Sequence, residues 1–149
     1  MTNTALTNTA LTNPALTNTD RHTASVQRLY AAYRDRDLDA VLAELADDVD
    51  WAAEAAGTAV PWYGPFRGKE QVPGFFAAIG KNVDVTEFEL VGIAANETDV
   101  YATIHWTYTV PATGRSASMY MQHWWRFADG KIVFFRGSED SGQSIAAFA

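Results

Sequence analysis

Alternation between apolar and polar positions dominates the second half of the chain. Successive side chains of a strand point to opposite faces of a sheet, so this pattern predicts strands. We expect them over residues 83–95, 100–110, 116–127 and 131–136. Asp129-Gly130, between the last two, is typical of a tight hairpin turn. Consecutive strands joined by short turns predict an antiparallel sheet.

The first half of the chain shows helical spacing instead, with apolar residues three or four positions apart. Asp20 or Thr23 can cap a first helix, and Asp37 can cap a second one. A short strand over residues 49–54 and a third helix over residues 68–80 follow. Helices that precede the strands predict an α+β domain, with the helices on one face of a curved sheet.

Two segments lack this regular periodicity. Residues 1–20 repeat a five-residue unit with too little apolar surface to fold alone, so we expect a flexible tail before a single domain over residues 21–149. Residues 55–67 are rich in Gly and Pro and contain Trp62 and Tyr63. Because aromatic side chains are costly to leave in water, we interpret this loop as a lid.

Composition and charge narrow the range of partners. The formal net charge is −7 and the 11 Lys and Arg residues are scattered, which argues against nucleic-acid binding. No apolar run reaches the roughly 18 residues of a membrane span, and the N-terminus lacks the pattern of a secretory signal, so we expect a cytoplasmic protein without membrane contact. The chain has no cysteine and its 3 histidines are far apart, so we expect neither a metal nor a cofactor.

Several segments of the chain resemble one family. Residues 26–39, 45–49 and 75–76, with the aromatic strand that leads into residues 129–132, are similar to ketosteroid isomerase and SnoaL-like proteins of the nuclear transport factor 2-like superfamily. The resemblance covers residues 22–148. It implies a cone-shaped, curved antiparallel sheet packed against three N-terminal helices (a cystatin-like roll), with a pocket inside the cone. This fold hosts isomerases, cyclases, hydrolases, dehydratases and non-catalytic binders, so the resemblance leaves the activity open.

The polar groups that ketosteroid isomerase uses are replaced in this chain. With the first helix aligned, the family's oxyanion-hole tyrosine falls at Leu29, its base at Ala53 and its protonated aspartate at Gln122. Tyr30 and Glu54 are adjacent to two of these positions, but a one-residue shift on a strand turns the side chain to the other face. Steroid isomerase activity is therefore not expected.

The candidate catalytic residues are Gln122, His105 and Glu54. The Gln122 amide can polarise a ligand carbonyl without titrating, or it can be a buried amide bonded to protein groups. His105 is suited to moving a proton near neutral pH, or it is hydrogen-bonded within the sheet. Glu54 can act as a base if its side chain turns inward, and is otherwise solvated. The candidate ligand-binding residues, which alternatively belong to the core, are Trp51, Trp62, Tyr63, Tyr120 and Trp124.

Residues 116–127 have two faces, and neither is dominated by charge. We interpret the face that carries Gln122 as the pocket lining, because polar groups stand among aromatics there. The other face carries Met119, Met121, His123, Trp125 and Phe127. Left uncovered, that second face would be a large apolar patch of a size that is rare in monomers, so we predict a homodimer through it. Glu139-Asp140, near the C-terminus, can reach the mouth of the cone, but adjacent charges of this kind are usually solvent-facing, and we interpret them so.

Three functions are compatible with these features. The first is a SnoaL-like enzyme, a cofactor-independent isomerase or cyclase that binds an apolar carbonyl compound and transfers a proton. The second is a non-catalytic module that binds a small hydrophobic ligand. The third is a dimeric interaction domain whose pocket has no ligand. The first two functions predict saturable binding of a small apolar molecule, and the third predicts none.

Overall fold

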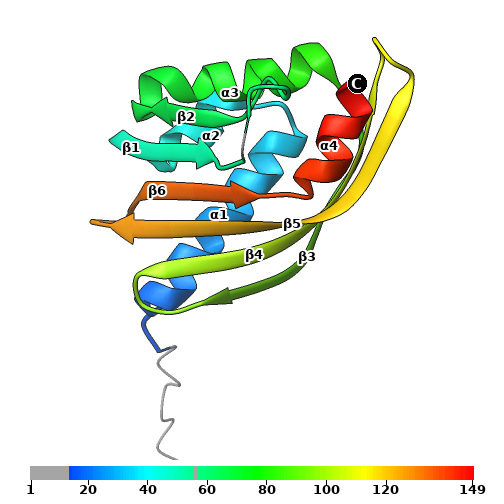
Figure 1. Cartoon of the computed structure of the whole chain (residues 1–149). Coiled ribbons are helices and arrows are strands. Elements are labelled where there is room, and N and C mark those ends of the chain that lie inside the picture. Colours follow the sequence, from blue (N-terminus) through cyan, green and yellow to red (C-terminus); the bar gives the residue numbers. More distant parts are fainter. Residues whose placement is uncertain (1–13, 56) are drawn as a thin grey trace, which may run out of the picture.

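The computed structural model describes residues 14–55 and 57–149 (Figure 1). The flexible tail expected over residues 1–20 therefore lies mostly outside the described residues. In chain order the elements are α1 (Asn18–Arg34), α2 (Leu38–Ala43), β1 (Leu45–Ala53), β2 (Gly64–Arg67), α3 (Gly68–Asn82), β3 (Asp84–Ala95), β4 (Asp99–Val110), β5 (Arg115–Ala128), β6 (Lys131–Ser138) and α4 (Ser141–Phe148). Among the described residues, no helix is both long enough and apolar enough to cross a bilayer.

Helix α1 begins earlier than the sequence pattern predicts. Thr17 is its N-cap: Thr17 Oγ1 accepts a hydrogen bond from the backbone N–H of Asp20, and the Asp20 carboxylate accepts one from the backbone N–H of Thr17. This reciprocal capping box satisfies two N–H groups that the helix leaves unpaired, and it places residues 18–20 of the expected tail in the helix. Asp37 caps α2 as predicted, because its side chain accepts from Ala40 N.

The strands form one six-stranded sheet in the order β2-β1-β6-β5-β4-β3. Strands β3 to β6 pair antiparallel with their chain neighbours, as predicted. Strand β1 pairs parallel with β6, and β2 forms within the segment interpreted as a lid loop. The fold is therefore α+β with a mixed, mostly antiparallel sheet.

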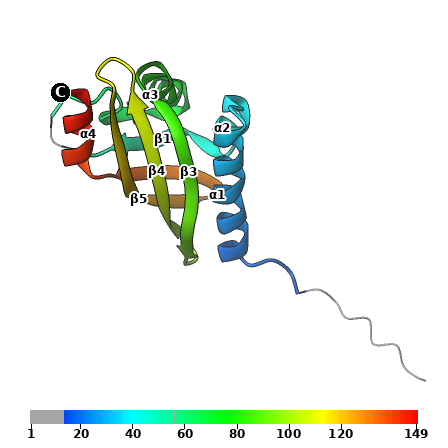
Figure 2. The ribbon, with the colours of Figure 1, turned by 90° about the vertical axis from the view of Figure 1, so that its right-hand side faces the viewer.

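The sheet curves around a single aromatic core. Figure 2 shows α1 and α2 on one side of strands β3 to β5, α4 on the other, and α3 above them. Trp51 on β1, Phe75 on α3 and Phe135 on β6 meet in this core, and the ring centroids of Trp51 and Phe135 are 4.2 Å apart. Aromatic pairs at such distances stabilise the core beyond their buried area.

The two faces of β5 are reversed relative to the sequence interpretation. Met119, Met121 and Trp125 point into the core and are at most 8% exposed, whereas Tyr120 is 63% exposed. Gln122 lies with Tyr120 on the outer face of the sheet. The apolar face predicted to form the dimer contact is therefore covered by the protein's own helices, and that prediction is wrong in its choice of face. The cause is physical: both faces carry aromatic residues, so alternation alone cannot show which one is buried.

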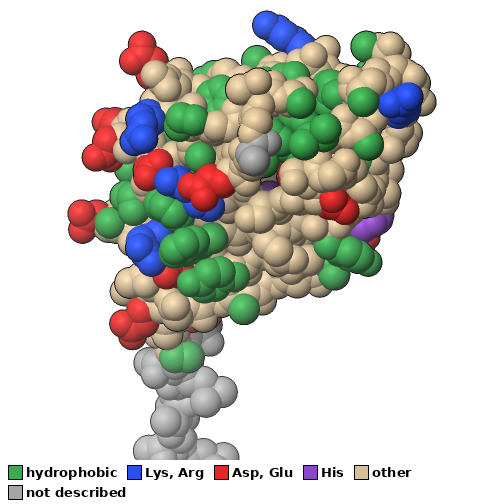
Figure 3. All heavy atoms as spheres, viewed as in Figure 1, with side chains coloured by type: hydrophobic (Ala, Val, Ile, Leu, Met, Phe, Trp, Pro, Cys, Tyr) green, Lys and Arg blue, Asp and Glu red, His purple; other side chains and the backbone are tan. Residues whose placement is uncertain are grey.

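The surface in Figure 3 carries acidic and basic side chains mostly along the left of the view, near the turn that joins β5 to β6. The two signs are interspersed there. Arg126 on β5 binds Asp99 on β4, with Arg126 Nε 2.8 Å from Asp99 Oδ1, and Asp99 is only 5% exposed. This ion pair joins the start of β4 to the end of β5.

Candidate functional site

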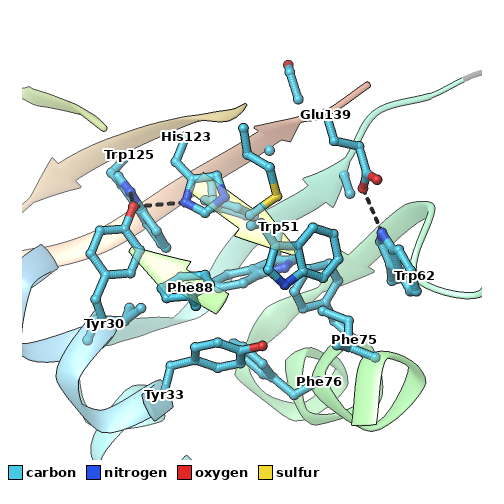
Figure 4. Close-up of a pocket in the computed structure, with 18 residues that line it drawn as sticks. Tyr30, Tyr33, Trp51, Trp62, Phe75, Phe76, Phe88, His123, Trp125 and Glu139 are labelled. Atoms are coloured by element: carbon cyan, nitrogen blue, oxygen red, sulfur yellow. Dashed lines mark hydrogen bonds between the residues drawn. The ribbon is translucent and has the colours of Figure 1, made fainter. Parts of the chain in front are cut away.

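The curved sheet and the helices enclose a cavity of about 60 Å³ (Figure 4). Its wall is almost entirely apolar and largely aromatic. The lining residues are Leu29, Tyr30, Tyr33, Trp51, Ala53, Trp62, Phe75, Phe76, Ile79, Phe88, Trp106, Met121, His123, Trp125, Phe135, Gly137, Ser138 and Glu139. The few polar groups in this wall decide what chemistry the cavity can support.

Tyr30, His123 and Trp125 form a hydrogen-bonded triad on one side of the cavity. Trp125 Nε1 donates to the Tyr30 hydroxyl at 3.0 Å, and that hydroxyl lies 2.8 Å from His123 Nδ1. Because the Tyr30 oxygen already accepts from Trp125, its own hydrogen needs an acceptor, and Nδ1 is the group in reach. We therefore assign Nδ1 as the acceptor, which places the ring hydrogen of His123 on Nε2.

His123 is neutral in this setting. Burial lowers the pKa of its imidazole to about 3, because the apolar wall disfavours the charged ring. Its second nitrogen points into the cavity in Figure 4. Among the described residues, no acceptor bonds Nε2. His123 Nε2–H is therefore a donor available to a ligand oxygen, and the indole N–H groups of the wall residues Trp51 and Trp106 also lack a partner among the described residues.

Glu139 supplies the cavity's carboxyl group. One of its oxygens, Oε1, accepts from Trp62 Nε1 at 2.7 Å, and the other accepts from the hydroxyl of Ser144. Ser144 in turn accepts from the Tyr108 hydroxyl at 2.8 Å. These bonds tie the end of β6 to the segment before β2 and to helix α4, so they fix the carboxyl in the cavity wall.

Burial raises the pKa of the Glu139 carboxyl, and the hydrogen bonds from Ser144 and Trp62 only partly oppose this effect. The nearby charge of Asp140 raises it further. A carboxyl with a raised pKa is a stronger base, once ionised, than an ordinary carboxyl. Glu139 is therefore the group in the cavity best suited to proton transfer.

Gln122 does not reach the cavity. It lies on the outer face of the sheet, where Thr103 Oγ1 donates to Gln122 Oε1 at 2.8 Å. Tyr120 and Trp124 are on the same side, and Trp124 stacks on Tyr101 with centroids 6.3 Å apart. The placement of Gln122, Tyr120 and Trp124 in the pocket is therefore wrong, for the same reason as the reversed faces of β5.

His105 and Glu54 also lie outside the cavity wall. His105 Nδ1 is 2.9 Å from Glu87 Oε1, on the outer face of β4. The Glu54 side chain is 70% exposed and pairs with Arg136, whose Nε is 2.7 Å from Glu54 Oε1. Glu54 thus points away from the cavity, while Ala53 lines it. The inward orientation that a catalytic role for Glu54 required is absent from this structure.

The aromatic residues Trp51 and Trp62 do lie in the cavity wall. Trp51 is fully buried, and Trp62 is held by Glu139. Tyr63, next in the chain, is partly buried beside Trp62 and does not line the cavity. A ligand-binding role for Trp51 and Trp62 is compatible with this placement and stays a prediction.

Sequence reasoning missed Tyr30, His123 and Glu139 as cavity residues. A one-residue shift of the family alignment, from Leu29 to Tyr30 and from Gln122 to His123, brings both into the wall. The signal for this shift was the run of purely apolar neighbours around His123 on its own face of β5. For Glu139 the sequence contains no comparable signal, because its burial depends on contacts far away in the chain.

The comparisons with known proteins agree with this fold. A protein of unknown function described as NTF2-like, from Burkholderia pseudomallei, has a TM-score of 0.79 and 25% identity, covering 87% of this chain and 98% of its own. An NTF2-like protein from Burkholderia thailandensis has a TM-score of 0.76 and 26% identity, covering 85% and 95%. An LEH-like epoxide hydrolase from M. tuberculosis shares the fold, with a TM-score of 0.67 and 18% identity over 87% and 90%.

No curated protein matches the sequence. The family model described as a SnoaL-like domain matches residues 26–135. That segment runs from the middle of α1 to β6 and contains Tyr30 and His123, whereas Glu139 follows it. The chain therefore belongs to the SnoaL-like domain family, with the NTF2-like fold.

Proposed function

We propose that this chain binds a small, mostly apolar molecule with a carbonyl oxygen in the cavity, and that His123 Nε2–H donates a hydrogen bond to that oxygen. The observation that carries the proposal is the oriented, neutral His123 in a mostly apolar wall. A hydrogen bond of this kind contributes about 0.5–1.5 kcal/mol net to the binding of the ligand.

The size of the cavity restricts the ligand. Drug-sized ligands occupy sites of about 300–1,000 Å³, whereas this cavity measures about 60 Å³. A ligand larger than a few heavy atoms therefore requires aromatic side chains of the wall to move. The preferred ligand is compact, flat and apolar apart from its oxygen.

We propose further that Glu139 transfers a proton to and from this ligand, as in a cofactor-independent isomerase or cyclase. The Glu139 carboxylate takes a proton from the carbon next to the carbonyl group, and His123 Nε2–H stabilises the enolate oxygen that develops. In a β,γ-unsaturated carbonyl ligand the product is a dienolate, and return of the proton to its γ-carbon moves the carbon–carbon double bond into conjugation, which completes an isomerisation. The raised pKa of Glu139 supports this role, because it brings the carboxyl closer to the pKa needed for exchange near neutral pH.

A non-catalytic binding module is the second candidate, and two observations favour it. Ala53 occupies the cavity wall at the position where the family resemblance places the base. Both oxygens of Glu139 are already bonded, to Trp62 and Ser144, which makes a purely structural role for this carboxyl self-consistent. In that case the cavity binds the ligand without changing it.

We also propose that two copies of the chain associate through the outer face of β3 to β5. Tyr101 and Tyr120 are 45% and 63% exposed on this face, and large exposed aromatics are typical of contact surfaces. Sedimentation at micromolar concentration tests the proposal: we expect a dimer in the native chain and a monomer in Tyr120→Glu. A native monomer would exclude the dimer and, with it, the interaction-domain alternative.

Deuterium exchange separates the enzyme from the binder. Butanone in D₂O is followed by proton NMR with native protein, with Glu139→Gln and without protein. The enzyme proposal predicts exchange next to the carbonyl above the protein-free rate, lost in Glu139→Gln. Saturable binding without exchange would leave the binding module, and no binding at all would overturn both.

A further inference from the structure

A groove of about 820 Å³ runs along the outside of the helices next to the cavity. It lies between the end of α1, helices α2 and α3, and strand β3. Its lining residues are Ala32, Tyr33, Arg34, Arg36, Asp37, Leu38, Val41, Pro73, Phe76, Ala77, Ile79, Gly80, Val83, Asp84, Val85, Glu87 and Phe88. The groove is more polar than the cavity and is open to solvent along part of its length.

Four residues belong to both walls: Tyr33, Phe76, Ile79 and Phe88. They form a partition one side chain thick, with the cavity on one side and the groove on the other. The ring of Tyr33 lies 4.7 Å from that of Phe88 and 5.7 Å from that of Phe76, centroid to centroid. These rings come from three different elements, α1, α3 and β3, so the partition depends on side-chain packing alone.

The partition can open without breaking the fold. Tyr33, Phe76 and Phe88 are each partly exposed, unlike Trp51 and Trp125 deeper in the cavity. Among the described residues, the Tyr33 hydroxyl has no hydrogen-bond partner. Rotation of these side chains therefore breaks aromatic contacts worth about 0.5–1.5 kcal/mol per pair and no hydrogen bond. Side-chain motions of this kind are fast compared with ligand binding.

We propose that the cavity and the groove form one two-part binding site, joined through a gate made by Tyr33, Phe76 and Phe88. The inference rests on the proposed ligand binding in the cavity and extends it to the shape of the ligand. The natural ligand is elongated and amphipathic: its carbonyl end occupies the cavity at His123, its apolar middle replaces the gate contacts, and its polar end lies in the groove.

The groove suits such a polar end. It offers exposed apolar surface at Leu38 and Val85, each 36% exposed, next to charged side chains of both signs such as Arg36 and Asp84. Mixed apolar and polar lining of this kind matches a molecule that is neither fully apolar nor a small ion. The groove volume also removes the size restriction that the cavity alone imposes.

Two ketones of different length test the proposal. Butanone is short enough to stay on the cavity side, and the fluorescent naphthyl ketone 6-propionyl-2-dimethylaminonaphthalene reaches through the gate. In the full chain, Val85→Asp places a charge in the groove outside the cavity wall. Val91→Asp, at an exposed position of the same strand, is the matched control.

We expect Val85→Asp to weaken the naphthyl ketone about tenfold or more and to leave butanone unchanged, with Val91→Asp changing neither. We also expect Phe76→Leu, which shortens the gate, to raise both the association and the dissociation rate of the naphthyl ketone in stopped-flow fluorescence. Equal effects of Val85→Asp on both ketones, or none on either, would overturn the two-part site. Failure of both ketones to bind the native chain would instead overturn the proposed function.

Discussion

The Tyr30 hydroxyl bridges Trp125 and His123, at 3.0 Å from Trp125 Nε1 and 2.8 Å from His123 Nδ1. This bridge joins helix α1 to strand β5 inside the cavity wall and fixes the orientation of the imidazole. It does so without any charge, because burial raises the pKa of the Tyr30 hydroxyl and lowers that of His123. The orientation of the His123 Nε2–H donor therefore depends on packing and on the Tyr30 hydroxyl.

Removal of the Tyr30 hydroxyl should lower the stability of the folded chain. Tyr30→Phe keeps the ring but leaves Trp125 Nε1 and His123 Nδ1 without a partner in a buried setting. We expect a loss of about 2–4 kcal/mol in the free energy of unfolding, measured by urea denaturation. Tyr120→Phe, at an exposed tyrosine of β5, is the control and should change the stability by less than about 0.5 kcal/mol. Equal stabilities of the two variants would show that the bridge contributes nothing.

Burial of neutral His123 makes stability depend on pH. The folded chain resists protonation down to about pH 3, whereas an unfolded histidine titrates near pH 6.5. Between these values the unfolded state binds the extra proton, so stability falls as the pH decreases. From about pH 7 to about pH 5 this group accounts for a loss of about 2 kcal/mol. We expect His123→Gln to remove that component, and an unchanged difference between the two pH values would contradict the assignment.

Glu139 should affect the pH dependence of stability in the opposite direction to His123. Its pKa in the folded protein lies above the ordinary value of 4.5, so the folded state holds the proton longer than the unfolded state. Stability contributed by this carboxyl is present at low pH and is lost as the pH rises from about 4.5 through the raised pKa. Because His123 contributes equally to both proteins, the decline is measured as a difference: in thermal unfolding, the native chain should lose stability relative to Glu139→Gln as the pH rises across this range. Glu70→Gln, at an exposed carboxyl of α3, should leave the decline intact.

Gly137 leaves room beside His123 in the cavity wall. A Cβ at this position would lie 3.1 Å from Phe135 Cζ and 3.7 Å from His123 Cδ2. We expect Gly137→Ala to displace the Phe135 ring, which also lines the cavity, and to weaken the binding of butanone about tenfold, measured by NMR titration. Gly92→Ala, where nothing lies within 4 Å, should bind as the native chain does. Similar losses in the two variants would point to a general loss of stability.

The sequence was sufficient to predict the α+β class, the run from β3 to β6 and the cap of α2 by Asp37, because these depend on local alternation and local hydrogen bonds. It was insufficient for the parallel pairing of β1 with β6, which joins segments far apart in the chain. Strand β2 was not predicted for a similar reason. Its Gly-Pro sequence is typical of loops, and only its pairing with β1 makes it a strand.

Which polar residues line the cavity could not be predicted from the sequence. Both faces of β5 carry aromatic residues, so the sequence could not show which face is buried. In the structure His123 lines the cavity and Gln122 does not. Glu139 resembled a solvated charge next to Asp140. Its burial arises from Trp62 and Ser144, which approach it from two other parts of the fold.

The central claim is that His123 Nε2–H holds a ligand carbonyl in the cavity. The most direct test is the infrared carbonyl stretch of the naphthyl ketone, labelled with ¹³C at the carbonyl, when bound to the native chain and to His123→Phe. A hydrogen bond weakens the carbonyl bond, so we predict a lower stretching frequency in the native complex than in the variant. Equal frequencies in the two complexes would contradict the claim.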